Sequence, residues 1–225
     1  MIKSSFLFWL LIFSQSAFAG EAITFDNPGL NVVLASGRIA GYYTAVEGNK
    51  SCDFYFFGSE DYARKDSNGY TVIDIQTFAT QWEKFTYVER DRDFDIKGHI
   101  YRIGDKWIVQ TTDEPPGCGG AVGLFTKGPN DDHPFIYSVK RRFSAVAIRV
   151  VSRKTYLYRR SGNSFKKGGG YLTEGDNVVA LNTEGGFTNV RYTDPNYFSK
   201  KPGAVTVGWV RSSDLLDPFP PTPAK

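Results

Sequence analysis

Turns that contain glycine divide the chain into short β-prone runs, and this alternation limits the fold more than any other feature. Ile39–Val46 and Ser51–Phe57 are rich in aromatic and β-branched residues, and Glu47–Lys50 separates them as a turn. The dipeptide Gly104-Asp105 joins two further β-prone runs and predicts a tight hairpin of the II′ kind. Short strands at this spacing are typical of a meander or a partly closed barrel. We therefore expect an all-β first domain, built as an antiparallel meander or as a small, partly closed barrel.

A row of carboxylates interrupts this pattern. Strands are predicted over Tyr70–Ile75 and Phe85–Glu89, with one short helix over Thr77–Lys84 between them. Glu89–Asp95 then places four carboxylates at alternate positions, which would share one face of a strand. Such a row could be a solvated face, a docking surface for a basic protein, or a pair of glycosidase carboxylates. The sequence leaves these alternatives open.

The N-terminus has the order of a secretory signal peptide. Lys3 precedes the apolar run Phe6–Phe13, and Ala17–Ala19 supplies a small-x-small cleavage site. The apolar run is too short for a membrane anchor, which needs about 20 residues. We expect a signal peptide over 1–19, and after its removal a soluble periplasmic chain with no membrane anchor.

Two cysteines, Cys52 and Cys118, are present. An exported chain meets oxidising conditions, so an even pair predicts one disulfide, and two free buried thiols are the alternative. The bond would close a loop of 66 residues. Chain-entropy reasoning gives such a bond at most roughly 4 kcal/mol of stability. A catalytic cysteine is not expected, because a nucleophile would compete with disulfide formation.

The charge changes sign along the chain. Glu21–Asp132 holds 18 acidic and 11 basic residues, a net charge of −7, whereas His133–Lys225 holds 6 acidic and 15 basic residues, a net charge of +9. The change falls in Thr126–Pro134, where Gly, Pro, Asn and Asp indicate a loop. This boundary predicts a β-domain with one disulfide over 20–132, a connecting strand over 133–144, a second domain over 145–216, and a Pro-rich tail without a packing pattern over 217–225.

Three elements of the second domain follow one another in a distinctive order. Leu172–Leu181 reads L-x-x-G-D-x-V-x-x-L, Gly186–Val190 reads G-aromatic-x-x-V, and Gly208–Leu215 opens with Gly-Trp-Val. In this order they resemble the bacterial SH3-like domain over about Ala145–Leu216, a third of the chain. The resemblance implies a small barrel that binds peptidoglycan or a protein attached to it. The loop Thr193–Ala204 is longer than is usual in that family, which affects the groove beside it.

Basic and aromatic residues are interleaved in the second domain. From Pro134 to Thr173 there are ten Lys and Arg residues and no Asp or Glu. Such a field attracts anionic partners, and arginine both binds carboxylates bidentately and stacks on rings. Nucleic acid would suit this chemistry, but an exported protein rarely meets it, so we expect no nucleic-acid partner. Peptidoglycan stem peptides carry carboxylates, and an ordinary solvated surface is the alternative. The residues expected at the binding groove are Tyr156, Tyr158, Arg159, Arg160, Phe187, Tyr192 and Trp209, although Trp209 could equally belong to the core.

The residues suggest binding rather than catalysis. His99 and His133 lie on different segments without a nucleophile motif nearby, and two histidines with two paired cysteines are too few for a zinc site. We therefore expect no catalytic residue, metal or cofactor, and a non-enzymatic binding protein of the cell envelope. The alternative is an inhibitor or immunity protein that neutralises a periplasmic cell-wall hydrolase or a secreted antibacterial toxin. An enzyme that cleaves wall glycan through Glu89–Asp95 is the third hypothesis.

Overall fold

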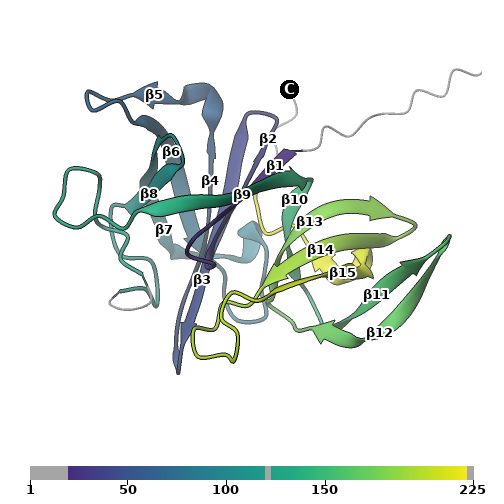
Figure 1. The fold of residues 1–225 in the computed structure, drawn as a ribbon. Helices are drawn as coiled ribbons and strands as arrows, with labels where there is room; N and C mark the ends of the chain where they lie inside the picture. Colours follow the sequence, from purple (N-terminus) through teal and green to yellow (C-terminus); the bar gives the residue numbers. More distant parts are fainter. Residues whose placement is uncertain (1–19, 120–122, 222–225) are drawn as a thin grey trace, which may run out of the picture.

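The computed structural model describes residues 20–119 and 123–221, so the predicted signal peptide lies outside the described residues. Within them the chain forms sixteen β-strands and short 3-10 turns, and no α-helix. The predicted all-β class is therefore confirmed. Figure 1 shows two curled sheets side by side, the first built from β1–β9 and the second from β10–β16. No helix of this part of the chain is long and apolar enough to cross a membrane.

The first sheet closes into a ring. Its hydrogen-bonded order is β4-β3-β2-β1-β9-β8-β7-β6-β5, and β4 also pairs with β6, so eight antiparallel strands form a barrel with β5 at the margin. The barrel is thus more complete than the meander or partly closed form predicted. Its strands are β1 (Gly20–Phe25), β2 (Leu30–Ala35), β3 (Arg38–Glu47), β4 (Lys50–Ser59), β5 (Arg64–Lys65), β6 (Thr71–Ala79), β7 (Asp91–Ile103), β8 (Lys106–Thr111) and β9 (Tyr137–Ala145).

The strand that closes the ring comes from the segment predicted to connect the two domains. β9 pairs with β1 from Gly20 to Phe25, and it also pairs with β8, where Trp107 lies opposite Tyr137. The connecting strand expected over 133–144 is thus a strand of the first sheet, which extends to Ala145. The loop in which the charge changes sign therefore lies inside this domain, because β9 follows that loop and still belongs to the barrel. The basic residues of β9 are exposed on the barrel surface.

Alternate side chains of the strands fill the barrel. Tyr43 and Phe54 point inward from β3 and β4, and their ring centres lie 4.9 and 4.8 Å from that of Phe125, which comes from the loop after β8. The predicted disulfide is present: Cys52 on β4 is bonded to Cys118 in the same loop. The loop is therefore held at the barrel by both a covalent bond and a buried ring. A disulfide fits a chain that folds in an oxidising compartment.

The second sheet is a half-barrel of seven antiparallel strands in the order β12-β11-β15-β14-β13-β10-β16. Its small core is made of aliphatic side chains, including Val151, Val178, Val190 and Val210. The short 3-10 turn η4 (Ser212–Asp214) leads into the last strand. The strands are β10 (Ala147–Val151), β11 (Thr155–Ser161), β12 (Ser164–Leu172), β13 (Asn177–Glu184), β14 (Phe187–Thr193), β15 (Val205–Arg211) and β16 (Leu215–Leu216).

Leu157 explains the glycines of this sheet. Gly168–Gly170 lies within β12, although three successive glycines suggest a break in the chain. A Cβ atom at Gly170 or at Gly208 of β15 would lie 3.0 Å from a δ-methyl carbon of Leu157. The glycines therefore leave room for the Leu157 side chain between β12 and β15.

An apolar interface joins the two domains. Tyr42 and Tyr55 point outward from the barrel and pack in one buried cluster with Ile148 and Val179 of the second sheet. The hydroxyl group of Tyr55 also donates a hydrogen bond to Oδ1 of Asn177 at 2.5 Å. This apolar packing holds the two domains together, since the burial of each such side chain contributes about 1.5–3 kcal/mol to stability. The two domains therefore share part of their core.

The Pro-rich tail belongs to this interface, which corrects the expectation that it does not pack. The Phe219 ring is buried, with its centre 5.8 Å from that of Tyr55 and 6.0 Å from that of Phe78. The Arg38 Nη1 atom donates a hydrogen bond to the Pro220 carbonyl oxygen at 3.2 Å. The sequence gives no sign of this, because a single aromatic residue among prolines has no periodicity. The partners of Phe219 are distant in sequence and meet only when the barrel has formed.

The segment between β6 and β7 also differs from its prediction. Thr77–Ala79 ends strand β6, so the helix expected over Thr77–Lys84 is wrong, and the strand expected over Phe85–Glu89 is instead the 3-10 turn η2 (Tyr87–Glu89). The cause is the burial of Phe78, whose ring centre lies 5.1 Å from that of Tyr87. Tertiary contacts override local propensity at such short segments.

Candidate functional site

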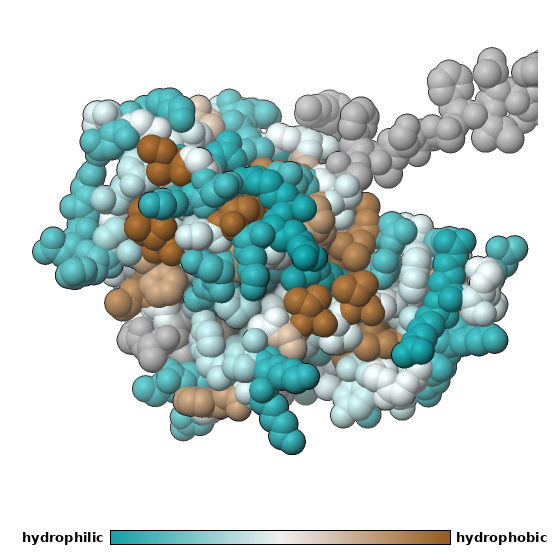
Figure 2. Space-filling view, viewed as in Figure 1, coloured by the Kyte–Doolittle hydropathy of each residue, from teal (hydrophilic) through white to brown (hydrophobic). Residues whose placement is uncertain are grey.

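The hairpin β11–β12 presents tyrosines and lysines together. Tyr156 on β11 pairs with Tyr171 on β12, and both rings are exposed. The Nζ atom of Lys167 lies 3.3 Å from the centre of the Tyr156 ring, and that of Lys154 lies 4.0 Å from the centre of the Tyr171 ring. Each ring thus positions an ammonium group through a cation–π contact, worth about 0.5–1 kcal/mol at exposed sites. Figure 2 shows that hydrophilic side chains cover most of this end of the molecule.

A pocket of about 420 Å³ adjoins these residues. Asp214 of η4 lies at one side, buried, and accepts hydrogen bonds of 2.7 Å from Thr155 Oγ1 and from Arg153 Nε. Burial raises the pKa of Asp214, but the hydrogen bonds from Thr155 and Arg153 lower it by more, so the pKa of this carboxyl group lies below its usual value. Asp214 thereby fixes the guanidinium group of Arg153 beside the pocket. We call this the basic–aromatic pocket; its lining residues are Arg153, Lys154, Thr155, Tyr156, Tyr158, Lys167, Arg211 and Asp214.

The positive charge of this pocket is largely uncompensated. Asp214 pairs with Arg153, and among the described residues no carboxylate lies within ion-pair distance of Lys154, Lys167 or Arg211. Each ammonium group offers up to three donors and each guanidinium five. The pocket is therefore suited to an anionic group, above all a carboxylate.

A second group of rings lies beside the pocket. The Phe165 ring stacks on Phe187 with centres 4.2 Å apart, contacts Trp209 at 5.0 Å, and Phe187 in turn contacts Tyr158 at 4.9 Å. All four side chains are half-buried. Trp209 lies on this surface and outside the aliphatic core of the sheet, the alternative location considered for it. Tyr158 lines the pocket as well, so it links the two groups of rings.

The residues predicted for the groove are thus distributed over three places. Tyr156 and Tyr158 line the basic–aromatic pocket, whereas Phe187 and Trp209 belong to the neighbouring rings. Three others lie differently: Arg159 is exposed on β11, Arg160 forms an ion pair with Glu184 at 2.6 Å, and Tyr192 packs on the domain core and hydrogen-bonds Asp176.

The sequence does not predict the other members of these groups as site residues, namely Arg153, Lys154, Thr155, Phe165, Lys167, Tyr171, Arg211 and Asp214. The available signal was local spacing: Lys154, just before β11, lies two residues from Tyr156 on that strand, and the hairpin places Tyr171 opposite Tyr156.

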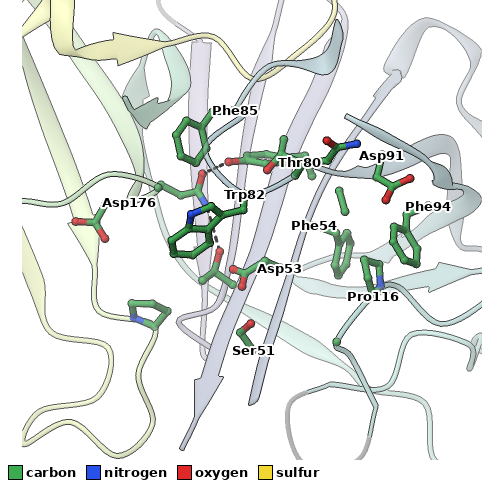
Figure 3. Close-up of a pocket in the computed structure, with 18 of the residues that line it drawn as sticks. Ser51, Asp53, Phe54, Thr80, Trp82, Phe85, Asp91, Phe94, Pro116 and Asp176 are labelled. Carbon is green, nitrogen blue, oxygen red and sulfur yellow. Dashed lines mark hydrogen bonds between the residues drawn. The ribbon is translucent and has the colours of Figure 1, made fainter. Parts of the chain in front are cut away.

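A larger hollow of about 580 Å³ lies between the barrel and the turn before β13 (Figure 3). Asp53 enters it from β4, Asp91 and Phe94 from the start of β7, and Trp82 and Phe85 from the loop after β6. The Trp82 side chain is 89% exposed. We call this hollow the acidic cleft.

Two carboxylates labelled in Figure 3, Asp53 of the barrel and Asp176 of the second domain, differ in orientation and in hydrogen bonding. Asp53 is open to solvent on one side, but burial by surrounding protein atoms raises its pKa above the usual value, against the effect of hydrogen bonds from Thr44 and Ser51. Asp176 turns its carboxylate away from the cleft and accepts hydrogen bonds from the backbone N and Oγ1 of Thr173 at 2.7 and 3.1 Å. Asp53 is therefore a cleft residue, whereas Asp176 stabilises its own turn.

The row Glu89–Asp95 is not one continuous strand face. Glu89 lies in η2, and Arg90 binds Asp95 through two hydrogen bonds of 2.7 Å while its guanidinium carbon lies 3.7 Å from the centre of the Tyr87 ring. Arg90 therefore does not point away from the carboxylates, as a strand would require. Of the row, Asp91 and Phe94 line the acidic cleft.

Neither a metal centre nor a relative identifies the chain. Among residues 20–119 and 123–221, no group of three or more His, Cys, Asp or Glu side chains could hold a metal ion. His99 lies on β7 with Nδ1 2.8 Å from Oδ1 of Asp74, which also pairs with Arg64. Three comparisons with known proteins, against family models, curated sequences and solved structures, find no match. Its function must therefore be inferred from its own residues and geometry.

Proposed function

We propose that the chain is a non-enzymatic binding protein of the cell envelope, exported to the periplasm, that recognises the carboxylates of peptidoglycan through the basic–aromatic pocket of an SH3-like domain. One observation carries this proposal: Lys154 and Lys167 are held over exposed tyrosine rings, next to Arg153 and Arg211, and neither lysine forms an ion pair with a carboxylate of the described residues. A peptide carboxylate would bind the cationic groups while an adjacent apolar part of the ligand contacts the rings.

The order of elements supports the SH3-like assignment. The motif strands Asn177–Glu184, Phe187–Thr193 and Val205–Arg211 are consecutive neighbours β13, β14 and β15, and they pair antiparallel. Trp209 faces the neighbouring rings rather than the core, as a binding residue would. The disulfide supports an oxidising compartment, in keeping with the periplasm.

Retention on purified sacculi tests the proposal. We expect the chain without residues 1–19 to be retained at low ionic strength and released as salt rises, because exposed charges are screened within about 10 Å at 0.1 M. The double variant Lys154→Gln, Lys167→Gln should bind about 5- to 30-fold more weakly, from roughly 0.5–1 kcal/mol for each exposed charge contact. The matched control Lys200→Gln, Lys201→Gln removes the same charge from a loop outside the pocket and should change retention less than twofold.

Amidation of the sacculi separates the ligand groups. If stem-peptide carboxylates are recognised, amidated sacculi should no longer retain the chain. The proposal fails if the unmodified chain is not retained at low salt, or if both double variants lose retention equally. Retention by a protein attached to the wall, lost when the sacculi are treated with protease, would also contradict direct recognition of peptidoglycan.

A further inference from the structure

We propose that the acidic cleft is a second recognition site, which takes a positively charged side chain, arginine above all, from a protein partner. This inference is independent of the basic–aromatic pocket, because the residues that line the two hollows are different. It supplies a concrete site for the inhibitor or immunity function that the sequence leaves as the alternative.

The geometry combines two elements that a cation requires. Figure 3 places Asp53 beside the indole ring of Trp82, and Asp91 beside the ring of Phe94. A guanidinium group in the cleft could form charge-assisted hydrogen bonds to one of these carboxylates while lying on the neighbouring aromatic face. The volume of the acidic cleft, about 580 Å³, lies within the usual range for ligand sites, about 300–1,000 Å³.

The cleft carboxylates Asp53 and Asp91 accept hydrogen bonds from neighbouring residues but have no cationic partner among the described residues. Among the described residues, no Lys or Arg lies within ion-pair distance of Asp53 or Asp91. Of the cations near them along the chain, Arg90 binds Asp95 through two hydrogen bonds and Lys84 Nζ lies 3.3 Å from Oε1 of Gln81. Lys50 and Arg92 are exposed and form no ion pair with either carboxylate. The negative charge of the cleft is therefore available to a cation from outside the chain.

The exposed tryptophan favours a protein over a small amine as the source of that cation. Trp82 is 89% exposed, whereas Trp107 is buried in the barrel. Tryptophan and arginine are the residue types most enriched at binding hot spots, where a partner covers them. The segment that contains the cleft residues belongs to the part of the chain with a net charge of −7, which would attract a basic protein surface and orient it.

The proposal is tested with a peptide probe, Ac-Gly-Arg-Gly-Arg-Gly-NH₂, and the same peptide with citrulline in place of arginine. Citrulline keeps the shape and loses the charge. Titration is followed through the emission of Trp82, with Trp82→Phe as the background, and through chemical shifts of the Asp53 and Asp91 amides. We expect saturable binding of the arginine peptide only, weakened 3- to 10-fold by Asp53→Asn or Asp91→Asn.

A matched control and two contrary outcomes keep the inference open to refutation. Asp132→Asn removes one exposed acidic charge outside the cleft and should change the affinity less than twofold. The proposal is overturned if both peptides bind alike, or if neither binds up to about 10 mM, where affinity is negligible. It is also overturned if the chain self-associates and Asp53→Asn abolishes this, because the occupant is then a second copy. Retention of the cleft variants on sacculi stays unchanged, so failure here is distinct from failure of the proposed function.

Discussion

Replacement of Phe219 by alanine should destabilise the whole chain, although the residue lies in the tail. The Phe219 side chain is only 9% exposed and packs on the rings of Tyr55 and Phe78, which belong to two barrel strands. The guanidinium carbon of Arg38 lies 5.7 Å from the centre of the same ring. Removal of the ring would therefore open space where the barrel, the second sheet and the tail meet.

The magnitude follows from these contacts. Truncation of a buried phenylalanine to alanine costs about 3–5 kcal/mol in tightly packed cores. Phe219 lies at the margin of the interface, close to the end of the chain, so the tail can move and fill part of the space. The loss should therefore lie below that range, at about 2–3 kcal/mol, including two edge-to-face ring contacts worth about 0.5–1.5 kcal/mol each.

Urea unfolding of the disulfide-bonded chain measures this loss. With a slope near 2 kcal/mol per molar urea, the transition midpoint should fall by about 1–1.5 M. Phe198→Ala is the matched control: that ring is 70% exposed, and its removal should cost less than about 0.5 kcal/mol. If the two variants unfold at the same urea concentration, the tail does not stabilise the interface and the reasoning is refuted.

Three further predictions concern charge and covalent linkage. Asp214→Asn should lower the free energy of unfolding in urea by about 1.5–3 kcal/mol, because Thr155 loses a charged acceptor. The pKa of Asp214 is lowered in the folded chain, so this stabilisation is present above about pH 3.9 and is lost as the pH falls through the lower folded value. The stabilities of wild type and variant should therefore converge in acid. Reduction of the Cys52–Cys118 bond should lower stability by about 2–4 kcal/mol, measured by unfolding with and without reductant, and an unchanged midpoint would contradict this. Because the pKa of Asp53 is raised, arginine-peptide binding should weaken as the pH falls through that raised value, and Asp53→Asn should flatten the profile.

Local turn chemistry made part of the fold predictable. Gly104 has a φ of 56°, as the first central position of a II′ turn requires, and it joins β7 to β8. The turn between β3 and β4 and the motif runs that became β13–β15 were likewise indicated by nearby residues, and the disulfide was indicated by the even number of cysteines. Each of these features depends on a few neighbouring positions or on the pairing of the two cysteines.

The remaining features depend on partners that are distant in sequence. The role of β9 in the first sheet follows from its pairing with β1, and the burial of Phe219 from its contacts with Tyr55 and Phe78. In the candidate sites, a sequence shows that lysines and tyrosines are interleaved but not that Lys167 lies over Tyr156. The sequence indicated only one side of the acidic cleft, through the row Glu89–Asp95. Asp53 and Trp82 were not predicted, because they approach the cleft from segments with no shared motif.

The pairing of β1 with β9 also determines when the barrel can form. β1 ends at Phe25 and its neighbour begins at Tyr137, so more than a hundred residues must be made before the ring can close. At about 5–20 residues per second, synthesis of that stretch takes roughly 5–20 seconds. Throughout this interval β1 has an unpaired edge that another nascent chain could join. The chain therefore needs protection from aggregation until β9 has paired with β1.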